Sequence, residues 1–148
     1  MIDKLDLKYM KLALNEAKKG YLLDEVPIGC VIVSSGVVIR AHNTKEKTKD
    51  ATCHAEINAI KKACKKLDAK VLPNATIYVT VEPCLMCLGA ILQARITRLV
   101  YGAKEEKFGA TSVLDNYQSN HTLLVSGGVL ENEAKELMQE FFKAKRLK

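Results

Sequence analysis

Four residues of this chain have the types and the spacing of a catalytic metal site. One residue separates His54 from Glu56, and two residues separate Cys84 from Cys87. Histidine nitrogen and cysteine sulfur are ligands of zinc, and three protein ligands leave one position of a tetrahedral zinc ion open. Water in that position has its pKa lowered to about 7, which makes hydroxide available at neutral pH. Because Glu56 lies two residues from a ligand and could move the proton that this water gives up, the four residues predict a hydrolytic zinc enzyme.

A structural zinc site and a redox dithiol are the alternatives for the paired cysteines. A closed structural site needs a fourth ligand. The local candidates are His42, Cys53 and His121, none of which has a paired spacing with His54. Five cysteines is an odd number, which cannot form a fully paired set of disulfides. Two metal-bound cysteines in a reducing compartment fit the composition better.

The hydrophobic pattern predicts alternating helices and strands that would position these residues. Helices are expected at about residues 5–20, 54–67, 83–94 and 131–145, and strands at about 28–33, 37–41, 76–81, 98–101 and 123–125. A turn at 34–36 makes the first two strands a hairpin, and a polar, lysine-rich loop covers 44–52. This order predicts a layered α/β domain with an at least partly parallel sheet.

Single residues mark several of the expected element ends. Gly20 is a stop signal for the first helix, Thr52 is a candidate N-cap of the second, and Pro83 suits the first turn of the third. Cys30 lies in an apolar run and Cys64 lies on the second helix. Both are expected to be small core residues, because free cysteine is often buried.

The starts of two predicted helices carry the four chemical residues. Cys84 and Cys87 are three apart, so both sulfur atoms fall on one face near a helix N-terminus, where the helix dipole favours the thiolate. His54 begins another helix, and the N-termini of two helices on one sheet can meet at one point. Positions two apart in a helix ordinarily point in different directions. His54 and Glu56 can therefore converge only if His54 lies at the edge of its helix.

Length and composition fit one compact domain over residues 1–148, since the chain is 48% hydrophobic and long enough to bury its own core. No apolar run has transmembrane length, and no basic region leads into an apolar stretch at the N-terminus. The sequence therefore gives no reason to expect a membrane partner, and a cytoplasmic location is the default expectation.

The net charge of +6, from 23 basic and 17 acidic residues, favours a polyanionic partner. Near the C-terminus the aromatic pair Phe141 and Phe142 is followed by Lys143, Lys145 and Arg146. Aromatic rings beside cations are typical of surfaces that hold unpaired nucleotides. A helix that ends in basic residues also complements its own dipole, so this segment has a simpler explanation as well.

The sequence resembles the bacterial tRNA adenosine deaminases of the cytidine deaminase-like superfamily over about residues 9–146. His-x-Glu followed by Pro-Cys-x-x-Cys is the signature of zinc nucleobase deaminases. The matching segments are Glu25-Val26-Pro27-Ile28-Gly29, Ala41-His42-Asn43, His54-Ala55-Glu56, Tyr78-Val79-Thr80-Val81-Glu82-Pro83-Cys84-Leu85-Met86-Cys87, Val100-Tyr101-Gly102-Ala103 and Phe141-Phe142. The long run that ends at Cys87 and the phenylalanine pair favour the tRNA branch over other deaminases.

The resemblance implies a three-layer α/β/α fold around a mixed five-stranded sheet, usually in a homodimer. It implies hydrolysis of adenosine to inosine at the wobble position, the first anticodon position of tRNA. One zinc ion per subunit would be held by His54, Cys84 and Cys87, with Glu56 as the proton shuttle, and Asn43 would hydrogen-bond the inserted base. Contacts to the anticodon loop would come from Glu105, Lys107, Phe141, Phe142, Lys145 and Arg146. Simpler roles are a strand-end cap for Asn43 and core packing for at least one ring of the phenylalanine pair.

One loop departs from the family pattern. Relatives usually have Lys-x-Gly-Ala-x-Gly-Ser after the fourth strand, whereas this chain has Lys107-Phe108-Gly109-Ala110-Thr111-Ser112-Val113 without the second glycine. Glu105 also stands where bacterial relatives commonly have Asp. We expect the path of this loop and its RNA preference to differ, while the zinc chemistry stays the same.

Two other functions compete with tRNA deamination. A deaminase of free guanine, cytidine or a deoxynucleotide would share the zinc motifs but would need no RNA surface. A non-catalytic RNA-binding subunit is expected to lose its acid/base residue, and this chain keeps Glu56.

Overall fold

Five strands form one mixed sheet in the order β2-β1-β3-β4-β5. The computed structural model describes residues 3–117 and 121–147. β1 is antiparallel to both of its neighbours, whereas β3, β4 and β5 are mutually parallel. The elements are α1 (Lys4–Leu22), β1 (Gly29–Ser34), β2 (Val37–His42), α2 (Lys45–Thr48), α3 (Ala55–Leu67), β3 (Thr76–Val81), α4 (Leu85–Gln93), β4 (Arg98–Ala103), the 3-10 helix η1 (Thr111–Asp115), β5 (Leu124–Ser126) and α5 (Glu131–Arg146).

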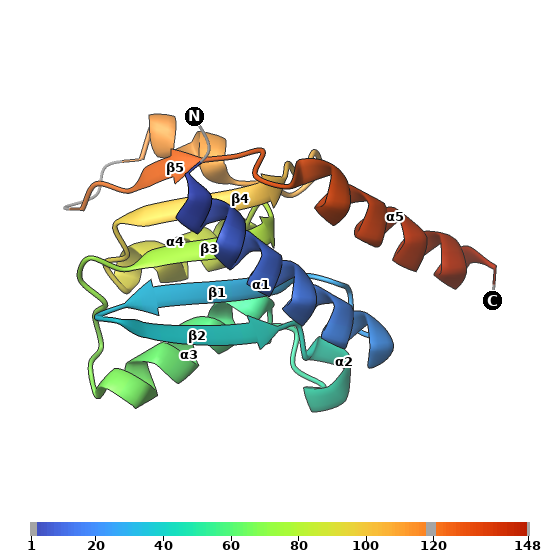
Figure 1. Cartoon of the computed structure of the whole chain (residues 1–148), viewed down its shortest axis with the longest axis horizontal. Coiled ribbons are helices and arrows are strands. Elements are labelled where there is room, and N and C mark those ends of the chain that lie inside the picture. The colour runs from blue at the N-terminus through green and yellow to red at the C-terminus, as the bar shows by residue number, and fades with distance from the viewer. Residues whose placement is uncertain (1–2, 118–120, 148) are drawn as a thin grey trace.

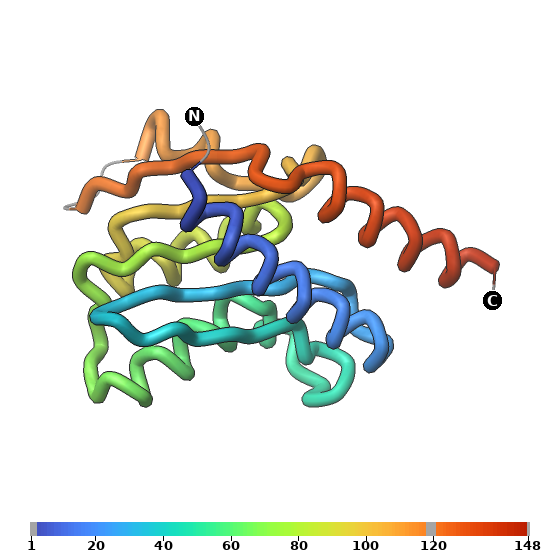
Figure 2. Tube along the Cα trace, viewed as in Figure 1, coloured from blue at the N-terminus to red at the C-terminus, as the bar shows by residue number. Residues whose placement is uncertain are grey.

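The helices lie on both faces of this sheet and make three layers. Figure 1 shows α1 crossing one face, while α3 and α4 pack behind the other face. α5 begins against β4 and contacts α1, and its last turns project beyond the sheet, as the trace in Figure 2 shows. The predicted three-layer arrangement around a mixed five-stranded sheet is therefore confirmed.

Alternation along the strands divides the core between the two faces, because successive strand residues point to opposite sides. Cys30 and Ile32 pack in the larger core against α3 and α4, and Val31 between them packs with α1. The expected core position of Cys30 is confirmed, and Cys64 is partly buried against the same core. On the α1 face, a Cβ atom at Gly29 would overlap the backbone of Ala13, so glycine is needed for α1 to pack this close to β1.

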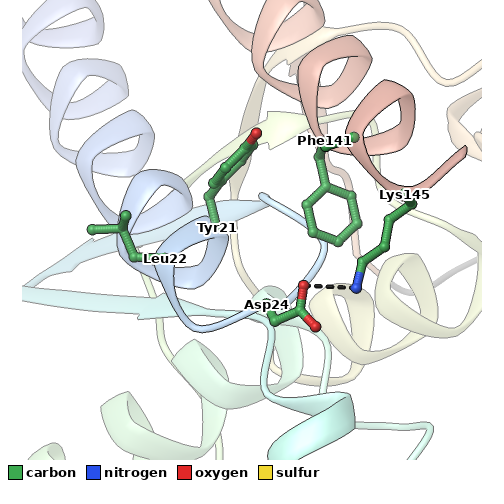
Figure 3. A pocket seen from close by; sticks show the side chains of 6 residues that line it. Tyr21, Leu22, Asp24, Phe141 and Lys145 are labelled. Atoms are coloured by element: carbon green, nitrogen blue, oxygen red, sulfur yellow. Dashed lines mark ion pairs between the residues drawn. The ribbon is translucent and has the colours of Figure 1, made fainter. Parts of the chain in front are cut away.

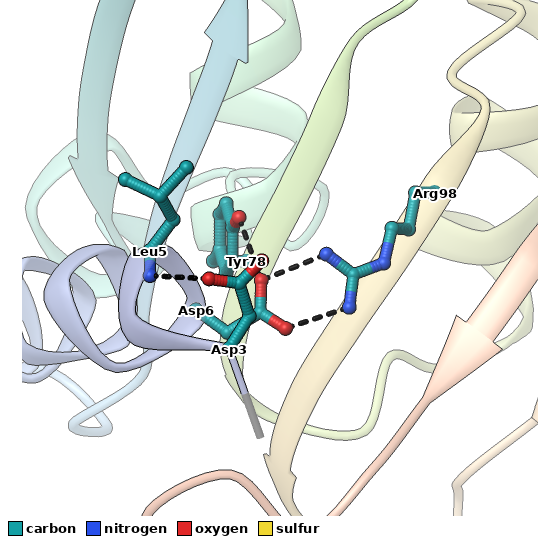
Figure 4. A network of polar contacts seen from close by, with 5 residues as sticks. All are labelled: Asp3, Leu5, Asp6, Tyr78 and Arg98. Carbon is teal, nitrogen blue, oxygen red and sulfur yellow. Dashed lines mark hydrogen bonds and ion pairs between the residues drawn. The ribbon is translucent and has the colours of Figure 1, made fainter. Parts of the chain in front are cut away.

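An ion pair joins the start of α1 to the sheet (Figure 4). Both terminal guanidinium nitrogens of Arg98, Nη1 and Nη2, donate to the Asp6 carboxylate at 2.7 Å, and the Tyr78 hydroxyl donates to the same carboxylate at 3.0 Å. Asp6 is only 3% exposed. The hydrogen bonds from Arg98 lower the pKa of Asp6, which keeps the carboxyl group ionised in the folded protein. This network lies at the amino end of β4.

Three element ends differ from the sequence-based expectation. α1 continues past Gly20 and ends at Leu22. The N-cap of α3 is His54 rather than Thr52, and α4 begins at Leu85, so that Pro83 precedes the helix instead of lying in its first turn. The last two shifts place His54 and Cys84, two of the predicted zinc ligands, at the N-caps of α3 and α4.

A short helix, α2, was not predicted inside the polar 44–52 loop. The carboxylate of Glu25 accepts the backbone N–H of Glu46 at 3.0 Å and of Lys47 at 2.8 Å. These are first-turn N–H groups, which have no partner within a helix. Glu25 is 2% exposed and comes from the α1–β1 connection, so a buried carboxylate far back in the sequence stabilises α2.

No helix in the described parts of the chain combines the length and the apolarity that crossing a membrane requires.

Candidate active site

Three side chains of metal-ligand type meet where α3 and α4 begin. His54 is the N-cap of α3, Cys84 is the N-cap of α4, and Cys87 lies in the first turn of α4. The His54 Nδ1 atom lies 3.4 Å from Cys87 Sγ and 3.7 Å from Cys84 Sγ, and all three atoms lie within 4.8 Å of one another. No other such cluster occurs among residues 3–117 and 121–147, and Cys53 is not part of this one.

The spacing of these atoms fits a zinc ion. Bonds of about 2.0 Å to nitrogen and about 2.3 Å to sulfur place neighbouring ligands of a tetrahedral zinc about 3.5 Å apart. The two nitrogen–sulfur distances, 3.4 and 3.7 Å, lie on either side of that value. Two sulfurs and one imidazole are a donor set that zinc accepts, and three ligands leave a fourth position open.

The cysteine pair already favours one thiolate. Hydrogen bonds with Cys87 and His54 lower the pKa of Cys84 to about 3. The bond with Cys84 in turn raises the pKa of Cys87 and of His54. Both sulfurs lie at the N-terminus of α4, where free N–H groups and the helix dipole also stabilise negative charge. The hydrogen bonds and the N-terminus of α4 therefore stabilise the thiolate form of Cys84 without the help of a cation.

Glu56 lies beside the cluster in the first turn of α3 and is 4% exposed. Burial raises the pKa of Glu56 to about 7, and the charge of His54 opposes this rise. A carboxyl group with a pKa near neutrality can both accept and donate a proton, as a general acid/base must. Because His54 lies at the N-cap and not within the helix, the condition for His54 and Glu56 to converge is met.

Asn43 follows β2 and caps α3. Its Oδ1 atom accepts the backbone N–H of Ala55 at 2.6 Å, whereas the His54 side chain makes no cap hydrogen bond. This contact fixes the helix start next to His54. Asn43 also lines a cavity over the cluster, so its amide joins the helix start to the binding space.

A cavity of about 390 Å³ opens over the cluster at the carboxyl ends of β2, β3 and β4. Helix N-termini and polar side chains at the carboxyl ends of parallel strands are the usual binding site of α/β sheets. The lining residues come from six separate segments of the chain: Val26, Ile28, Asn43, Lys45, His54, Glu56, Val81, Glu82, Cys84, Glu105, Lys107, Phe108, Met138 and Phe142.

Only part of the predicted RNA-contact set lines this cavity. Glu105, Lys107 and Phe142 lie on its wall, and Phe142 is 42% exposed. The Glu105 carboxylate accepts the backbone N–H groups of Lys107 and Phe108 at 2.9 and 3.4 Å, so it also shapes the turn that carries these residues.

Phe141 and Lys145 lie around a neighbouring hollow of about 380 Å³ between α5 and the end of α1 (Figure 3). The Phe141 ring is buried and packs edge-on against Tyr21, as the core-packing alternative for one ring expected. The Lys145 ammonium forms an ion pair with Asp24 at 2.6 Å and lies over the Phe141 ring. Arg146, in the last turn of α5, is exposed.

Sequence reasoning missed seven residues of the cavity wall: Val26, Ile28, Lys45, Val81, Glu82, Phe108 and Met138. Phe108 is exposed in the loop that departs from the family pattern, and Met138 lies one helical turn before Phe142 on α5. The only sequence signal for Glu82 was its place in the run that matches the family, directly before Pro83. Its burial could not be inferred from the sequence.

Comparison with known proteins identifies close relatives. A family model described as MafB19-like deaminase matches residues 4–146. The tRNA-specific adenosine deaminase of Aquifex aeolicus is 43% identical over 143 residues, covering 93% of this chain and 94% of the relative. The tRNA-specific adenosine deaminase of Bacillus subtilis is 43% identical over 148 residues, covering 97% of this chain and 92% of the relative.

Solved structures agree with the fold. A structure from a study of A-to-I editing by tRNA:A34 deaminases at the wobble position of transfer RNA superimposes with a TM-score of 0.84. It is 43% identical and covers 88% of this chain and 98% of its own. A guanine deaminase from Nitrosomonas europaea has a TM-score of 0.78 at 23% identity, over 91% of this chain and 83% of its own, a likeness of fold alone. The predicted cytidine deaminase-like fold is confirmed.

Proposed function

The chain belongs to the family of tRNA-specific adenosine deaminases, and from this premise we propose that it hydrolyses adenosine to inosine at the first anticodon position of tRNA. One observation carries the mechanism: the His54, Cys84 and Cys87 side chains converge beside the buried carboxylate of Glu56, under a cavity. Relatives that are 43% identical over nearly the whole chain support tRNA as the substrate.

His54, Cys84 and Cys87 would hold one zinc ion per subunit. When bound, zinc lowers the pKa of a coordinated water and so supplies a nucleophile at neutral pH. The Cys84 thiolate is already stabilised by its neighbours, and Asn43 fixes the backbone beside His54. The ligands are therefore held in place by the helix starts and need little rearrangement to bind the metal.

Glu56 moves the protons of the reaction. It takes a proton from water as the water oxygen adds to C6 of adenine, and it gives that proton to N1. The second proton of the water passes to the amino group, which leaves as ammonia, so that adenosine and water give inosine and ammonia. Burial keeps the pKa of Glu56 near 7, which suits a group that must take up and release a proton in one cycle.

The substrate base enters the cavity from an unpaired loop. Extruding a base costs little when it is already single-stranded, as in an anticodon. The Asn43 amide lines the cavity and is positioned to hydrogen-bond the base. Glu105, Lys107 and Phe142 would contact the anticodon loop at the cavity, and Phe141, Lys145 and Arg146 would contribute from the last turns of α5. The net charge of +6 supports binding to an RNA backbone.

Residues 1–148 would act as a single zinc-dependent deaminase domain in a cytoplasmic homodimer. The family resemblance is the main support for the dimer. The side chains of Leu85 and Met86, 64% and 37% exposed at the start of α4, are apolar surface that a second copy could cover.

The first experiment incubates the purified protein with an unmodified tRNA that carries adenosine at the first anticodon position. We expect inosine at that position, with free guanine and cytidine unchanged in parallel reactions. Glu56→Ala is the control: it should abolish turnover while zinc content and tRNA binding persist. Ammonia released only from a free base or nucleoside would replace this proposal with that of a metabolic deaminase, and unchanged turnover in Glu56→Ala would overturn the mechanism.

A further inference from the structure

Glu82 is a buried carboxylate that the mechanism does not use. It follows the last residue of β3, comes two residues before the ligand Cys84, and is 5% exposed. Its Oε1 atom accepts the backbone N–H of Glu105 at 3.2 Å, and its Oε2 atom accepts the backbone N–H of Thr111 at 3.1 Å. The Thr111 hydroxyl also donates to Oε2. Both oxygens are therefore bound to the two ends of one segment, residues 105–111, which we call the rim segment.

The rim segment has no helix or strand of its own before Thr111, where η1 begins. It carries Lys107 and Phe108, which lie on the cavity wall, with the Lys107 ammonium over the Phe108 ring. The Phe108 side chain is largely exposed, so little packing holds it in place. The position of these two residues depends on what anchors the ends of the segment.

Hydrogen bonds tie the rim segment to the residues that lead into the first cysteine ligand, and Ala110 packs in the larger core. Besides the bonds to Glu82, the Ala110 N–H donates to the Pro83 carbonyl at 3.0 Å. A Cβ atom at Gly109 would overlap the Glu82 carboxylate and the Glu105 carbonyl, so glycine is required for this close approach. The same short stretch, Glu82 to Cys84, thus presents a ligand to the metal and holds the cavity rim.

We propose that Glu82 is a positioning residue that fixes the rim segment over the cavity and thereby sets the affinity for the RNA substrate; this rests on the proposed tRNA deaminase function. An ionised carboxylate is suited to the task because it accepts from three donors and carries no proton of its own. Its hydrogen bonds with backbone N–H groups are charge-assisted and thus stronger than neutral ones. Since both oxygens are bound by protein donors, Glu82 acts through the segment and not on the reacting base.

Glu82→Gln is the decisive variant. The amide keeps the size of the side chain but replaces one acceptor oxygen with an NH₂ group, which would face an N–H donor of the rim segment. Amide hydrogen exchange at Glu105 and Thr111, measured in the zinc-loaded protein without RNA, should accelerate about tenfold or more, as loss of a charge-assisted hydrogen bond implies. The matched control, Glu25→Gln, removes the same acceptor from the buried carboxylate that holds α2. It should accelerate exchange at Glu46 and Lys47 and leave Glu105 and Thr111 unchanged.

Kinetics separate positioning from chemistry. With a tRNA that carries the target adenosine, Glu82→Gln should raise KM about tenfold while kcat stays within about twofold and zinc stays at one per chain. Gly109→Ala displaces the same segment with the carboxylate intact and should reproduce the rise in KM. A loss of kcat at unchanged KM would overturn the proposal, because it would place Glu82 in the chemistry. Unchanged exchange at Glu105 and Thr111 would overturn it as well.

The exchange measurement needs no substrate. If the wild-type protein left tRNA unedited, the proposed function would fail, whereas exchange at Glu105 and Thr111 would still decide whether Glu82 holds the rim segment.

Discussion

The floor and the rim of the cavity are built in different ways. The floor consists of His54, Glu56, Cys84 and Cys87 at the starts of α3 and α4, where short-range spacing and regular helix geometry place each side chain. The rim consists of residues 105–111 and the exposed side of α5, and its side chains are held by contacts between distant segments. Within each helix start the floor side chains are therefore placed by local structure, whereas the rim side chains depend on tertiary contacts alone. Substitutions in the floor should therefore reduce catalysis, whereas substitutions in the rim should weaken binding of the substrate.

Removal of one ligand from the floor should have the largest effect. Cys87→Ser should reduce bound zinc well below one per chain and lower kcat/KM more than about 1,000-fold, because the metal supplies several kcal/mol to the reaction. Metal analysis of the purified protein and a tRNA deamination assay measure both. The control is Cys64→Ser, a half-buried cysteine outside the cluster, which should keep its zinc and its activity. Full zinc content in Cys87→Ser would contradict the assignment of the floor.

Activity should be next most sensitive to substitution of Asn43, which both holds the start of α3 and lines the cavity. Asn43→Ala removes the acceptor for the Ala55 N–H and the amide that lines the cavity, so kcat/KM should fall about 10- to 100-fold with zinc retained.

The matched control for Asn43 is Asn58→Ala. The Asn58 amide donates to His42 and Thr44 in the same region but does not line the cavity. This variant should lose about 1 kcal/mol of unfolding free energy and keep kcat/KM within about threefold. Equal losses of activity in the two variants would show that Asn43 acts only as a helix cap.

The sequence predicts the floor well for a physical reason. A ligand at a helix start and a second residue one turn or less away are related by local backbone geometry, which spacing in the sequence encodes. The predicted N-cap Thr52 was wrong: His54 is the N-cap residue, and the hydrogen bond to the helix start comes from Asn43, 12 residues before Ala55. The missed helix α2 has the same origin, since Glu25 reaches it from 21 residues away.

The rim could not be predicted in the same way. Glu82 lies 23 residues from Glu105 and 29 residues from Thr111, and nothing in the sequence pattern indicates that these groups meet. The phenylalanine pair shows the same limit. The sequence left core packing open for at least one ring without saying which, and the structure buries the ring of Phe141 against Tyr21 while that of Phe142 faces the cavity.

That pair gives a test within the rim. Phe142→Ala should raise KM for tRNA about tenfold with kcat and stability nearly unchanged, because an exposed ring that stacks on a base contributes to binding alone. Phe141→Ala should instead lower the free energy of unfolding by about 3 kcal/mol, as expected for loss of a buried ring. Chemical denaturation and steady-state kinetics distinguish them. If Phe141→Ala raised KM at full stability and Phe142→Ala did not, the assignment of the two rings would be reversed.

The smallest effect on activity should come from the Asp6–Arg98 ion pair, which lies at the amino end of β4, opposite the cavity. Asp6→Asn should leave kcat/KM within about twofold but lower the free energy of unfolding by about 2 kcal/mol at neutral pH, since it leaves the Arg98 charge without its partner. Hydrogen bonds from Arg98 lower the pKa of Asp6 in the folded protein. The stabilisation is therefore fully present above the unfolded-state value of about 3.9 and is lost as the pH falls through the lower, folded-state value.

The stability gap between wild type and Asp6→Asn should accordingly close in acid, below about pH 4. Tyr78→Phe provides the contrast, because it removes a neutral donor to Asp6 and leaves the ion pair with Arg98 intact. Tyr78→Phe should lower the free energy of unfolding by about 1 kcal/mol. Most of this difference in stability from wild type should persist as the pH falls toward 4. A gap for Asp6→Asn that stayed constant down to pH 3 would show that the carboxylate charge contributes nothing. The anchor of α1 would then be a matter of hydrogen-bond geometry and packing.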